Sequence, residues 1–391
     1  MPNRLSTAMP GAMLLISIIL AACSPPLAST PTAAPTTLPK PAAAASPGGS
    51  AGPAASPVSG AGAAASPAAA PKPAAAAVSD AEVEAARREG TVVIYASGEA
   101  AQWDPLKEAW NKRFPGIDLQ VVAQRGRESR EKVIAEQAAR RVLADIVSAG
   151  PDSTTELDKL GFLDAFQPPE LQGVQADFRD PRGILIPRNL NLYGLTVNTR
   201  LLPDGQEPKR WSDLVDPRYK GKIAMQDPRG SGGGMTIFTA LLKVHGEPYL
   251  QKLSEQQIFM GAQTADLRNA LIRGEYAILL TDTAENVSRS VESGAPIKFI
   301  RPEEGVAVTP ISVTVVKNAP HPNAAKLFAN WILSEEGQTA VASSGSTPVR
   351  TGIRAKAPEY GIDGVKILPR DDQESDPDRA AELTKIWERI F

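Results

Sequence analysis

The sequence predicts an α/β fold with a mostly parallel sheet. From Glu89 onward, short apolar runs bounded by turn residues alternate with stretches of helical periodicity. Residues 91–96 form the first such run, and a helix begins at Asp104 and Pro105, an N-cap followed by a proline at the first helical position. Because the strand–helix alternation repeats through residues 117–122 and 144–147, we expect βαβ units.

The composition excludes several classes of function. The 391 residues carry a formal net charge of -2, so nothing indicates a nucleic-acid partner. The one cysteine, Cys23, allows no intramolecular disulfide and no cysteine metal site. The two histidines, His245 and His321, are too few for a histidine-rich metal site and read as structural. We therefore expect no metal, no cofactor and no enzyme activity.

The amino terminus reads as a signal peptide over residues 1–23. Arg4 precedes an apolar run at residues 12–22 that is too short to span a bilayer and suits a signal sequence. The run ends Leu-Ala-Ala-Cys at Cys23, which resembles the lipobox of bacterial lipoproteins. The resemblance implies acylation of Cys23 with palmitate-type chains and a lipid anchor outside the cytoplasm, in the periplasm or at the cell surface. The alternative is an ordinary secretory signal with a coincidental cysteine.

Residues 24–79 read as a disordered linker. This stretch consists almost entirely of Ala, Pro, Ser, Thr and Gly and contains no aromatic residue. Such a composition buries too little apolar surface to offset chain entropy. We expect it to act as a spacer between the anchor and the folded part.

The middle of the chain contains a glycine-rich loop at residues 227–234. It follows a short apolar strand and precedes a helix over residues 236–243, an arrangement that aims backbone N–H groups at one point. No Gly-Lys-Ser/Thr follows, so it is not a nucleotide P-loop. The alternative is a plain turn. Further strands are expected at residues 190–198, 277–280 and 311–316, and helices at 268–273, 324–333, from 334 and at the carboxyl terminus.

Several stretches, taken in order, resemble the extracellular solute-binding proteins of ABC importers, in the branch that includes the ferric-iron-binding proteins. They are residues 90–95, 135–137, 144–147, 194–198, 211–214 with 220–224, and 319–337. The resemblance implies a two-lobed periplasmic-binding-protein-like fold, with each lobe a mixed sheet flanked by helices. Two crossing segments, near residues 190–198 and 305–315, would form the hinge.

The resemblance also implies domain boundaries and partners. Residues 80–193 and 310–391 would form lobe I, with the terminal helices packing on either lobe, and residues 194–309 would form lobe II. The partners would be a small-molecule solute, an ABC permease and its ATPase, and we expect a monomer. A sensor that passes its signal to a membrane receptor is an alternative that shares all these features.

Ligand residues are expected in the loops that follow strands, because ligands of open α/β sheets lie at the carboxyl ends of strands. Arginine recognises carboxylate or phosphate through a bidentate fork, so a small anionic solute is the predicted ligand. For each arginine the alternative is a solvated or ion-paired surface side chain. Further candidate neighbours of the site are Arg188, Arg350, Tyr95, Tyr193 and Trp103, and core packing is the alternative for Tyr95 and Tyr193. The predicted ligand residues are Ser97, Glu99, Arg125, Arg127, Asp227, Arg229, Ser231, Gly232 and Asp282.

The chain departs from the ferric-binding branch at the loop expected to carry its tyrosine pair. That loop reads Thr-Asp-Thr-Ala-Glu-Asn over residues 281–286 and contains no tyrosine. Glu99, Asp282 and Glu285 could supply carboxylate oxygens to ferric iron, so an iron-binding protein with carboxylate ligands remains the alternative.

Overall fold

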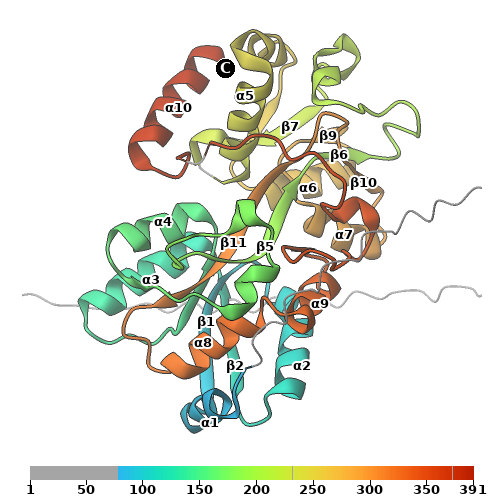
Figure 1. The fold of residues 1–391 in the computed structure, drawn as a ribbon. Helices are drawn as coiled ribbons and strands as arrows, with labels where there is room; N and C mark the ends of the chain where they lie inside the picture. The colour runs from blue at the N-terminus through green and yellow to red at the C-terminus, as the bar shows by residue number, and fades with distance from the viewer. Residues whose placement is uncertain (1–77, 231, 372) are drawn as a thin grey trace, which may run out of the picture. The chain divides into compact units, whose positions relative to one another are not determined.

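The computed structural model describes residues 78–230, 232–371 and 373–391. The predicted signal peptide, Cys23 and the linker up to residue 77 lie outside these residues, as does Ser231. Two β-sheets organise the described part, and helices cover both faces of each (Figure 1).

The larger sheet has seven strands. Its order is β12-β5-β11-β3-β1-β2, and β4 pairs with β11. β1, β2 and β3 run parallel, as the βαβ pattern predicts, whereas β11 runs antiparallel to β3 and β5. The strands are β1 (Thr91–Ser97), β2 (Asp118–Gln124), β3 (Ile146–Ala149), β4 (Leu163–Asp164), β5 (Ile186–Tyr193), β11 (Ala307–Val316) and β12 (Thr347–Pro348).

Helices from both ends of the described chain cover the larger sheet. One face carries a cluster of aromatic rings in which Trp110 lies 5.4 Å from Phe328 and 5.3 Å from Trp331. The opposite face packs Val133 and Leu157 against Tyr95 and Val147. The helices of the first face are α1 (Asp80–Glu89), α2 (Asp104–Arg113), α8 (Pro322–Trp331) and α9 (Glu335–Ser343), and those of the second are α3 (Gly126–Ala138) and α4 (Pro151–Lys159).

The smaller sheet has five strands in the order β10-β6-β9-β7-β8. One face packs against Leu267 and Val287, and the other against Phe238 and Trp387. The strands are β6 (Leu195–Asn198), β7 (Ile223–Gln226), β8 (Phe259–Gly261), β9 (Ile278–Leu279) and β10 (Ile297–Ile300). The helices are α5 (Gly233–Ser254), α6 (Thr264–Arg273), α7 (Ala284–Glu292) and, from the carboxyl terminus, α10 (Pro377–Ile390).

Two segments of chain cross between the sheets. β5 leads through Gly194 into β6, and β10 leads back into β11, which pairs with β5 in antiparallel fashion (Figure 1). A side chain at Gly194 would collide with the Ile300 carbonyl oxygen, so the crossing requires a glycine there. The predicted two-lobed fold with two crossing segments is confirmed. The larger sheet with its helices is called the larger lobe below, and the smaller sheet with its helices the smaller lobe.

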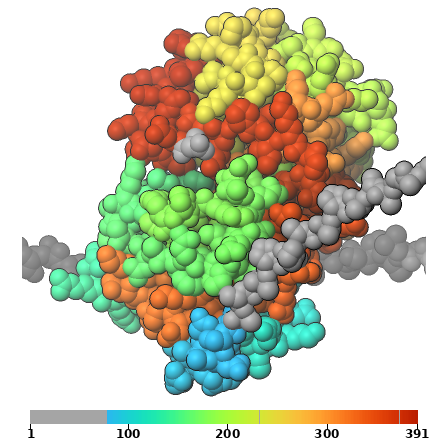
Figure 2. Space-filling model, viewed as in Figure 1, coloured from blue at the N-terminus to red at the C-terminus, as the bar shows by residue number. Residues whose placement is uncertain are grey.

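The carboxyl-terminal segment runs beside the second crossing. Val306 forms a parallel bridge with Ile367, and the Leu368 N–H donates to the Val306 carbonyl at 2.8 Å. The chain then reaches α10, whose Trp387 ring meets Phe238 of α5 edge-on at 5.2 Å. Figure 2 shows the red carboxyl-terminal residues against the yellow residues of α5. The predicted boundaries between the lobes at residues 193–194 and 309–310 stay a prediction.

Several elements differ from the sequence prediction. α7 begins at Ala284, inside the predicted loop, because the Thr283 hydroxyl accepts the Asn286 N–H and caps the helix. α4, which begins at Pro151, was not predicted, although proline suits the first helical position. α1 was not predicted, although Ser79 and Glu82 form a capping box that marks its start.

Candidate functional site

The carboxyl ends of β1, β2 and β3 meet in the larger lobe. Ser97 ends β1, and Gly126 begins the helix that follows β2. A Cβ on Gly126 would lie 3.7 Å from the Ser97 Cβ and 3.3 Å from the Ser153 Oγ of α4, so the three loops touch. The Ser153 hydroxyl is buried and has no hydrogen-bond partner among the described residues. This edge of the sheet therefore offers small side chains, and the Ser148 hydroxyl near the end of β3 is likewise buried without a partner among the described residues.

The glycine-rich loop of the smaller lobe leads to the first crossing strand. α5 begins at Gly233, where a Cβ would lie 2.9 Å from the Tyr193 Cε1 and 3.4 Å from the Thr281 carbonyl oxygen. The tyrosine ring thus packs on the helix start, which only glycine permits. Burial raises the pKa of Tyr193 to about 12, so the phenol remains neutral. The amino terminus of α5 therefore contacts the end of the first crossing strand.

Asp282 follows β9 and is completely buried. Its Oδ1 accepts hydrogen bonds from Arg268 Nη1 at 3.0 Å, Asn286 Nδ2 at 3.1 Å and the Thr283 N–H at 3.0 Å. Its Oδ2 has no partner among the described residues. Burial raises the pKa of Asp282, and the Arg268 guanidinium opposes this rise. The carboxylate holds the loop between β9 and α7 in place and keeps one oxygen free.

Helix α7 carries an ion pair that reaches the larger lobe. Glu285 Oε1 and Arg289 Nη1 lie 2.6 Å apart at positions i and i+4. Arg289 Nη2 lies 3.9 Å from Oε2 of Glu99, in the loop after β1. Glu99 is therefore brought to the junction of the lobes, but as the partner of an arginine.

Arg188 lies in β5 and is 2 % exposed. Its Cζ lies 4.5 Å from the centre of the Trp103 ring, in the 3₁₀ helix Ala100–Trp103 that follows β1. Arg188 Nε, Arg188 Nη1 and Trp103 Nε1 are buried and have no hydrogen-bond partner among the described residues. Burial lowers the pKa of Arg188 to about 10, although the charge of Glu285 opposes the shift. The guanidinium is thus charged at neutral pH and lacks a bonded counter-ion.

The two predicted arginines of the loop after β2 flank Gly126. Arg125 and Arg127 have exposed side chains and pair with acidic residues of their own helix: Arg125 Nε lies 3.8 Å from Glu128 Oε1, and Arg127 Nε lies 2.7 Å from Glu131 Oε1.

Two charged side chains of the glycine-rich loop pair with each other. Arg229 Nη2 lies 2.5 Å from Asp227 Oδ2, within the same loop. Gly232 is exposed and has a φ of 75°, which suits glycine. Ser231 lies outside the described residues. The assignment of the nine predicted residues to a ligand site therefore stays a prediction.

Sequence reasoning did not identify the arginines that lie at the junction on α6 and α7. The spacing of Glu285 and Arg289 was readable as an i, i+4 pair, but it does not reveal the contact with Glu99. The pairing of Arg268 with Asp282 joins residues of two separate elements, and no local pattern indicates it. Arg188 was named only as a neighbour of the site, since a lone arginine in a strand carries no signal of its burial.

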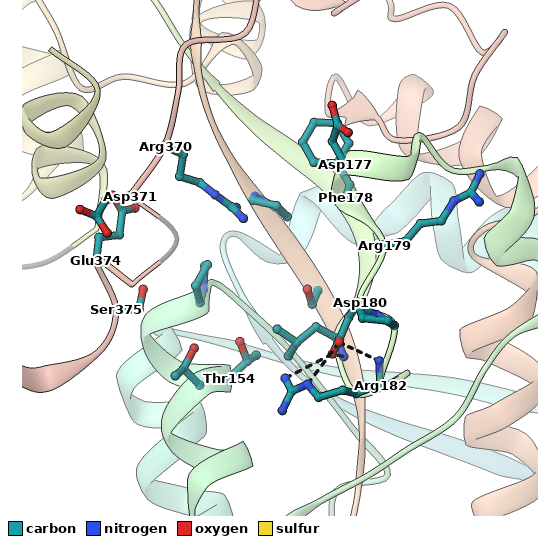
Figure 3. Close-up of a pocket in the computed structure, with 16 residues that line it drawn as sticks. Thr154, Asp177, Phe178, Arg179, Asp180, Arg182, Arg370, Asp371, Glu374 and Ser375 are labelled. Carbon is teal, nitrogen blue, oxygen red and sulfur yellow. Dashed lines mark hydrogen bonds and ion pairs between the residues drawn. The ribbon is translucent and has the colours of Figure 1, made fainter. Parts of the chain in front are cut away.

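A pocket of about 290 Å³ lies beside the crossing strands (Figure 3). Thr154 of α4 lines one wall, Asp180 and Arg182 of the segment before β5 line another, and Asp371 and Glu374 of the carboxyl-terminal segment line a third. Two of its charged side chains pair with residues outside the pocket. Arg182 Nη1 lies 2.7 Å from Asp158 Oδ2, and Asp371 Oδ2 lies 2.9 Å from Arg379 Nη2.

Glu374 is the acidic group of this pocket that faces α5. Its Oε1 and Oε2 accept the hydroxyls of Thr236 at 2.9 Å and Thr239 at 2.6 Å. Thr236 Oγ1 also lies 3.1 Å from Thr309 Oγ1 of β11. Burial raises the pKa of Glu374. These bonds connect the carboxyl-terminal segment, α5 and the second crossing strand.

Two searches for other kinds of site found nothing within residues 78–230, 232–371 and 373–391. No group of three or more His, Cys, Asp or Glu side chains is placed to hold a metal ion. No helix there is both long and apolar enough to cross a membrane.

Comparisons with known proteins place the chain among binding proteins. Over 297 residues it is 26% identical to an uncharacterized protein of Haemophilus influenzae, covering 72% of this chain and 84% of that one. Over 215 residues it is 26% identical to a "Putative 2-aminoethylphosphonate-binding periplasmic protein" of Salmonella typhimurium, covering 49% of this chain and 63% of the relative.

Solved structures of periplasmic binding proteins share the fold. AfuA from Actinobacillus pleuropneumoniae, with fructose-6-phosphate bound, matches with a TM-score of 0.61 and 23% identity, covering 77% of this chain and 98% of that one. Iron-bound HitA from Pseudomonas aeruginosa matches with a TM-score of 0.60 and 20% identity, covering 77% and 99%.

The family match covers more than half of the chain. Residues 142–363 match the family described as bacterial extracellular solute-binding protein. This range includes β5, the glycine-rich loop, α7 and β11, and therefore both crossing segments and most of the junction described above. The prediction of a solute-binding protein of the ABC-importer type is confirmed, and the chain belongs to the bacterial extracellular solute-binding protein family.

Proposed function

We propose that the protein captures a small anionic solute where its two lobes meet and delivers it to an ABC permease and its ATPase. The observation that carries the proposal is Arg188, a guanidinium buried in the first crossing strand without a bonded counter-ion among the described residues. Guanidinium groups bind carboxylate and phosphate oxygens through paired N–H donors. The Salmonella relative, named as a 2-aminoethylphosphonate-binding protein, supports a phosphonate or phosphate ester as the solute class.

Ferric iron is the second candidate, favoured by similarity to an iron uptake protein of Synechocystis. The carboxylates that could bind it are engaged with arginines. Asp282 Oδ1 lies 3.0 Å from Arg268, and Glu285 Oε1 lies 2.6 Å from Arg289. Glu99 Oε2 lies 3.9 Å from the same Arg289. Iron would have to displace these guanidiniums, which is why we place the anionic solute first.

We further propose that Cys23 is lipidated and holds the protein at the outer side of a membrane. The support is the Leu-Ala-Ala-Cys sequence that ends the apolar run. The alanine- and proline-rich residues up to 79 would then give the folded part reach from the anchor. Mass spectrometry of the protein from membranes should find an acylated amino-terminal cysteine, and a Cys23→Ala variant should be released into the soluble fraction.

Thermal unfolding in the presence of ligands tests the solute class. A ligand that binds only the folded state raises the melting temperature in a dose-dependent way. Phosphonates, phosphate esters, carboxylates, polyamines and ferric iron form the panel. We expect the phosphonates or phosphate esters to raise the melting temperature. A shift with ferric iron alone would show that the anionic solute class is wrong.

A further inference from the structure

Three buried N–H donors without an acceptor lie together beside β5. Arg188 Nε, Arg188 Nη1 and Trp103 Nε1 are all unpaired among the described residues, and the guanidinium lies 4.5 Å from the tryptophan ring centre. A buried N–H donor without a hydrogen-bond acceptor lowers the stability of the fold, because its burial removes its bonds to water. These donors would therefore bind an acceptor favourably. Because all three are donors, the missing group is an acceptor and not a second donor.

Two other arginines with little exposed surface, Arg268 and Arg350, have carboxylate partners. Arg268 Nη1 lies 3.0 Å from Asp282 Oδ1, and Arg350 Nη1 lies 2.8 Å from Glu170 Oε2. The Arg350 side chain is 10% exposed, yet its Nη1 also donates to the Leu333 carbonyl at 2.8 Å. Arg188 is 2 % exposed and has neither kind of partner. Arg188 therefore lacks the partners that Arg268 and Arg350 have.

The charges around Arg188 favour an anion. Glu285 is the carboxylate whose charge acts on the pKa of Arg188, but its Oε1 lies 2.6 Å from Arg289 Nη1 and is already paired. Arg188, Arg289 and Glu285 together carry one net positive charge. Glu99, the next carboxylate, lies 3.9 Å from Arg289 and its side chain is 63% exposed, so solvent screens it.

The position of Arg188 connects it to both lobes. Trp103 follows β1 of the larger lobe, and Glu285 lies in the first turn of α7, which covers the smaller sheet. Arg188 itself is part of the strand that leads to the crossing at Gly194. A change in the separation of the lobes would therefore open or close the space beside the guanidinium.

We propose that Arg188, oriented by the face of Trp103, is the seat for the anionic group of the solute. This inference rests on the proposed function, and it names the residue that sets the charge of the ligand. The oxygens of a carboxylate, phosphate or phosphonate group would accept from N–H groups of the Arg188 guanidinium and from Trp103 Nε1. The residue is a specificity determinant: it admits an anion and leaves a neutral analogue with an unpaired buried guanidinium.

The test measures binding of inorganic phosphate, methylphosphonate and acetate to the purified protein by isothermal titration calorimetry. Arg188→Met keeps the volume of the side chain and removes its charge and donors. We expect the affinity for the anion that binds best to fall on the order of 100-fold. Trp103→Phe keeps the ring and removes one N–H, so a smaller loss of about 5-fold is expected.

A matched control separates this role from a structural one. Arg130→Met removes an arginine that is 20% exposed and whose Nη1 lies 2.8 Å from Glu156 Oε2, and it should lower the melting temperature without changing anion affinity. Arg188→Met should leave the melting temperature of the ligand-free protein unchanged or raise it, because it removes an unpaired buried charge. If Arg188 only stabilised the fold, Arg188→Met would lower the melting temperature and leave the anion affinity unchanged.

The outcomes distinguish the two proposals. If the wild-type protein binds no anion, both proposals fail. If it binds phosphate or methylphosphonate and Arg188→Met binds with the same affinity, only the seat is wrong. If Arg188→Met does not fold, the anion affinities of Arg188→Lys and Trp103→Phe test the seat instead. Unchanged anion affinity in both variants overturns the inference. An anion that stays bound in native mass spectrometry and does not exchange with added phosphonate would also overturn it.

Discussion

The two lobes are built differently, although each is a sheet between helices. The larger lobe surrounds its aromatic cluster with helices that interleave with its own strands, and Trp110 packs there against Phe114, Phe328 and Trp331. In the smaller lobe, one face of the sheet is covered by α5 together with α10, which follows all the strands in the sequence. Its Trp387 ring packs edge-on against Phe238 of α5 and stacks on Phe391.

This difference shows that the smaller lobe depends on the carboxyl-terminal segment. The same segment contacts α5 through Glu374, and its Asp376 lies 2.5 Å from Lys159 of α4 in the larger lobe. A segment that holds one lobe together and also touches the other can influence how the lobes move. Variants of Trp387, Glu374 and Lys159 measure how much each contact of this segment contributes to the free energy of unfolding.

Trp387→Ala should have the largest effect. Trp387 is 4% exposed, and its truncation should lower the free energy of unfolding by about 3–5 kcal/mol. Hydrogen exchange should rise in α5 and α10 before it rises in β1. Trp110→Ala is the matched variant in the larger lobe and should show the opposite order. Equal exchange throughout the molecule in both variants would mean that the lobes unfold as one unit.

Glu374→Ala should have an intermediate effect. It leaves the hydroxyls of Thr236 and Thr239 without their carboxylate acceptor, at a cost of about 1–3 kcal/mol in urea denaturation. Glu382→Ala is the control, because this carboxylate is 64% exposed and pairs only with Arg379 in the same helix. A loss no larger than that of the control would show that the segment does not brace α5 through Glu374.

The pH dependence of stability should report the same contact. Burial raises the folded-state pKa of Glu374 above its ordinary value of 4.5, so the folded protein holds this proton more tightly than the unfolded chain. The contribution is fully present below the unfolded pKa and is lost as pH rises through the folded pKa. The stability of the wild-type protein relative to Glu374→Gln should therefore fall as pH rises above about 4.5. A constant difference between the two proteins from pH 4 to 7 would contradict this account.

Lys159→Met should have the smallest effect. The Lys159 and Asp376 side chains are 50% and 37% exposed, and exposed ion pairs contribute about 0–1 kcal/mol. The loss in urea denaturation should disappear at 1 M salt, where charges are screened within about 3 Å. A loss above about 2 kcal/mol, or one that survives high salt, would make this pair a main link between the lobes.

Local patterns predicted much of the fold. Strands β1 and β2 followed from apolar runs between turn residues, and α2 followed from Asp104 and Pro105 at its start. The crossing segments came from the resemblance to a family, because periodicity alone does not indicate which strands share a sheet. The pairing of β11 with both β3 and β5 depends on contacts far apart in the sequence.

The candidate site was less predictable than the fold. The loops after the strands were correctly placed at strand ends, but the charges within them turned out to pair locally, as with Arg229 and Asp227. Which arginine lies buried without a partner is decided by tertiary packing. The Arg188 guanidinium lies over the Trp103 ring, and the charge of Glu285 in α7 acts on its pKa. Neither Trp103 nor Glu285 is near Arg188 in the sequence.

The central claim is that the junction of the lobes binds a small anion. Isothermal titration of the purified protein with 2-aminoethylphosphonate, inorganic phosphate and ferric citrate, at low and high salt, tests it most directly. We predict saturable binding of one phosphonate or phosphate per protein, weakened in high salt and by Arg188→Met. Binding of iron alone would contradict anion binding at the junction, whereas equal anion binding in wild type and Arg188→Met would contradict only the seat at Arg188.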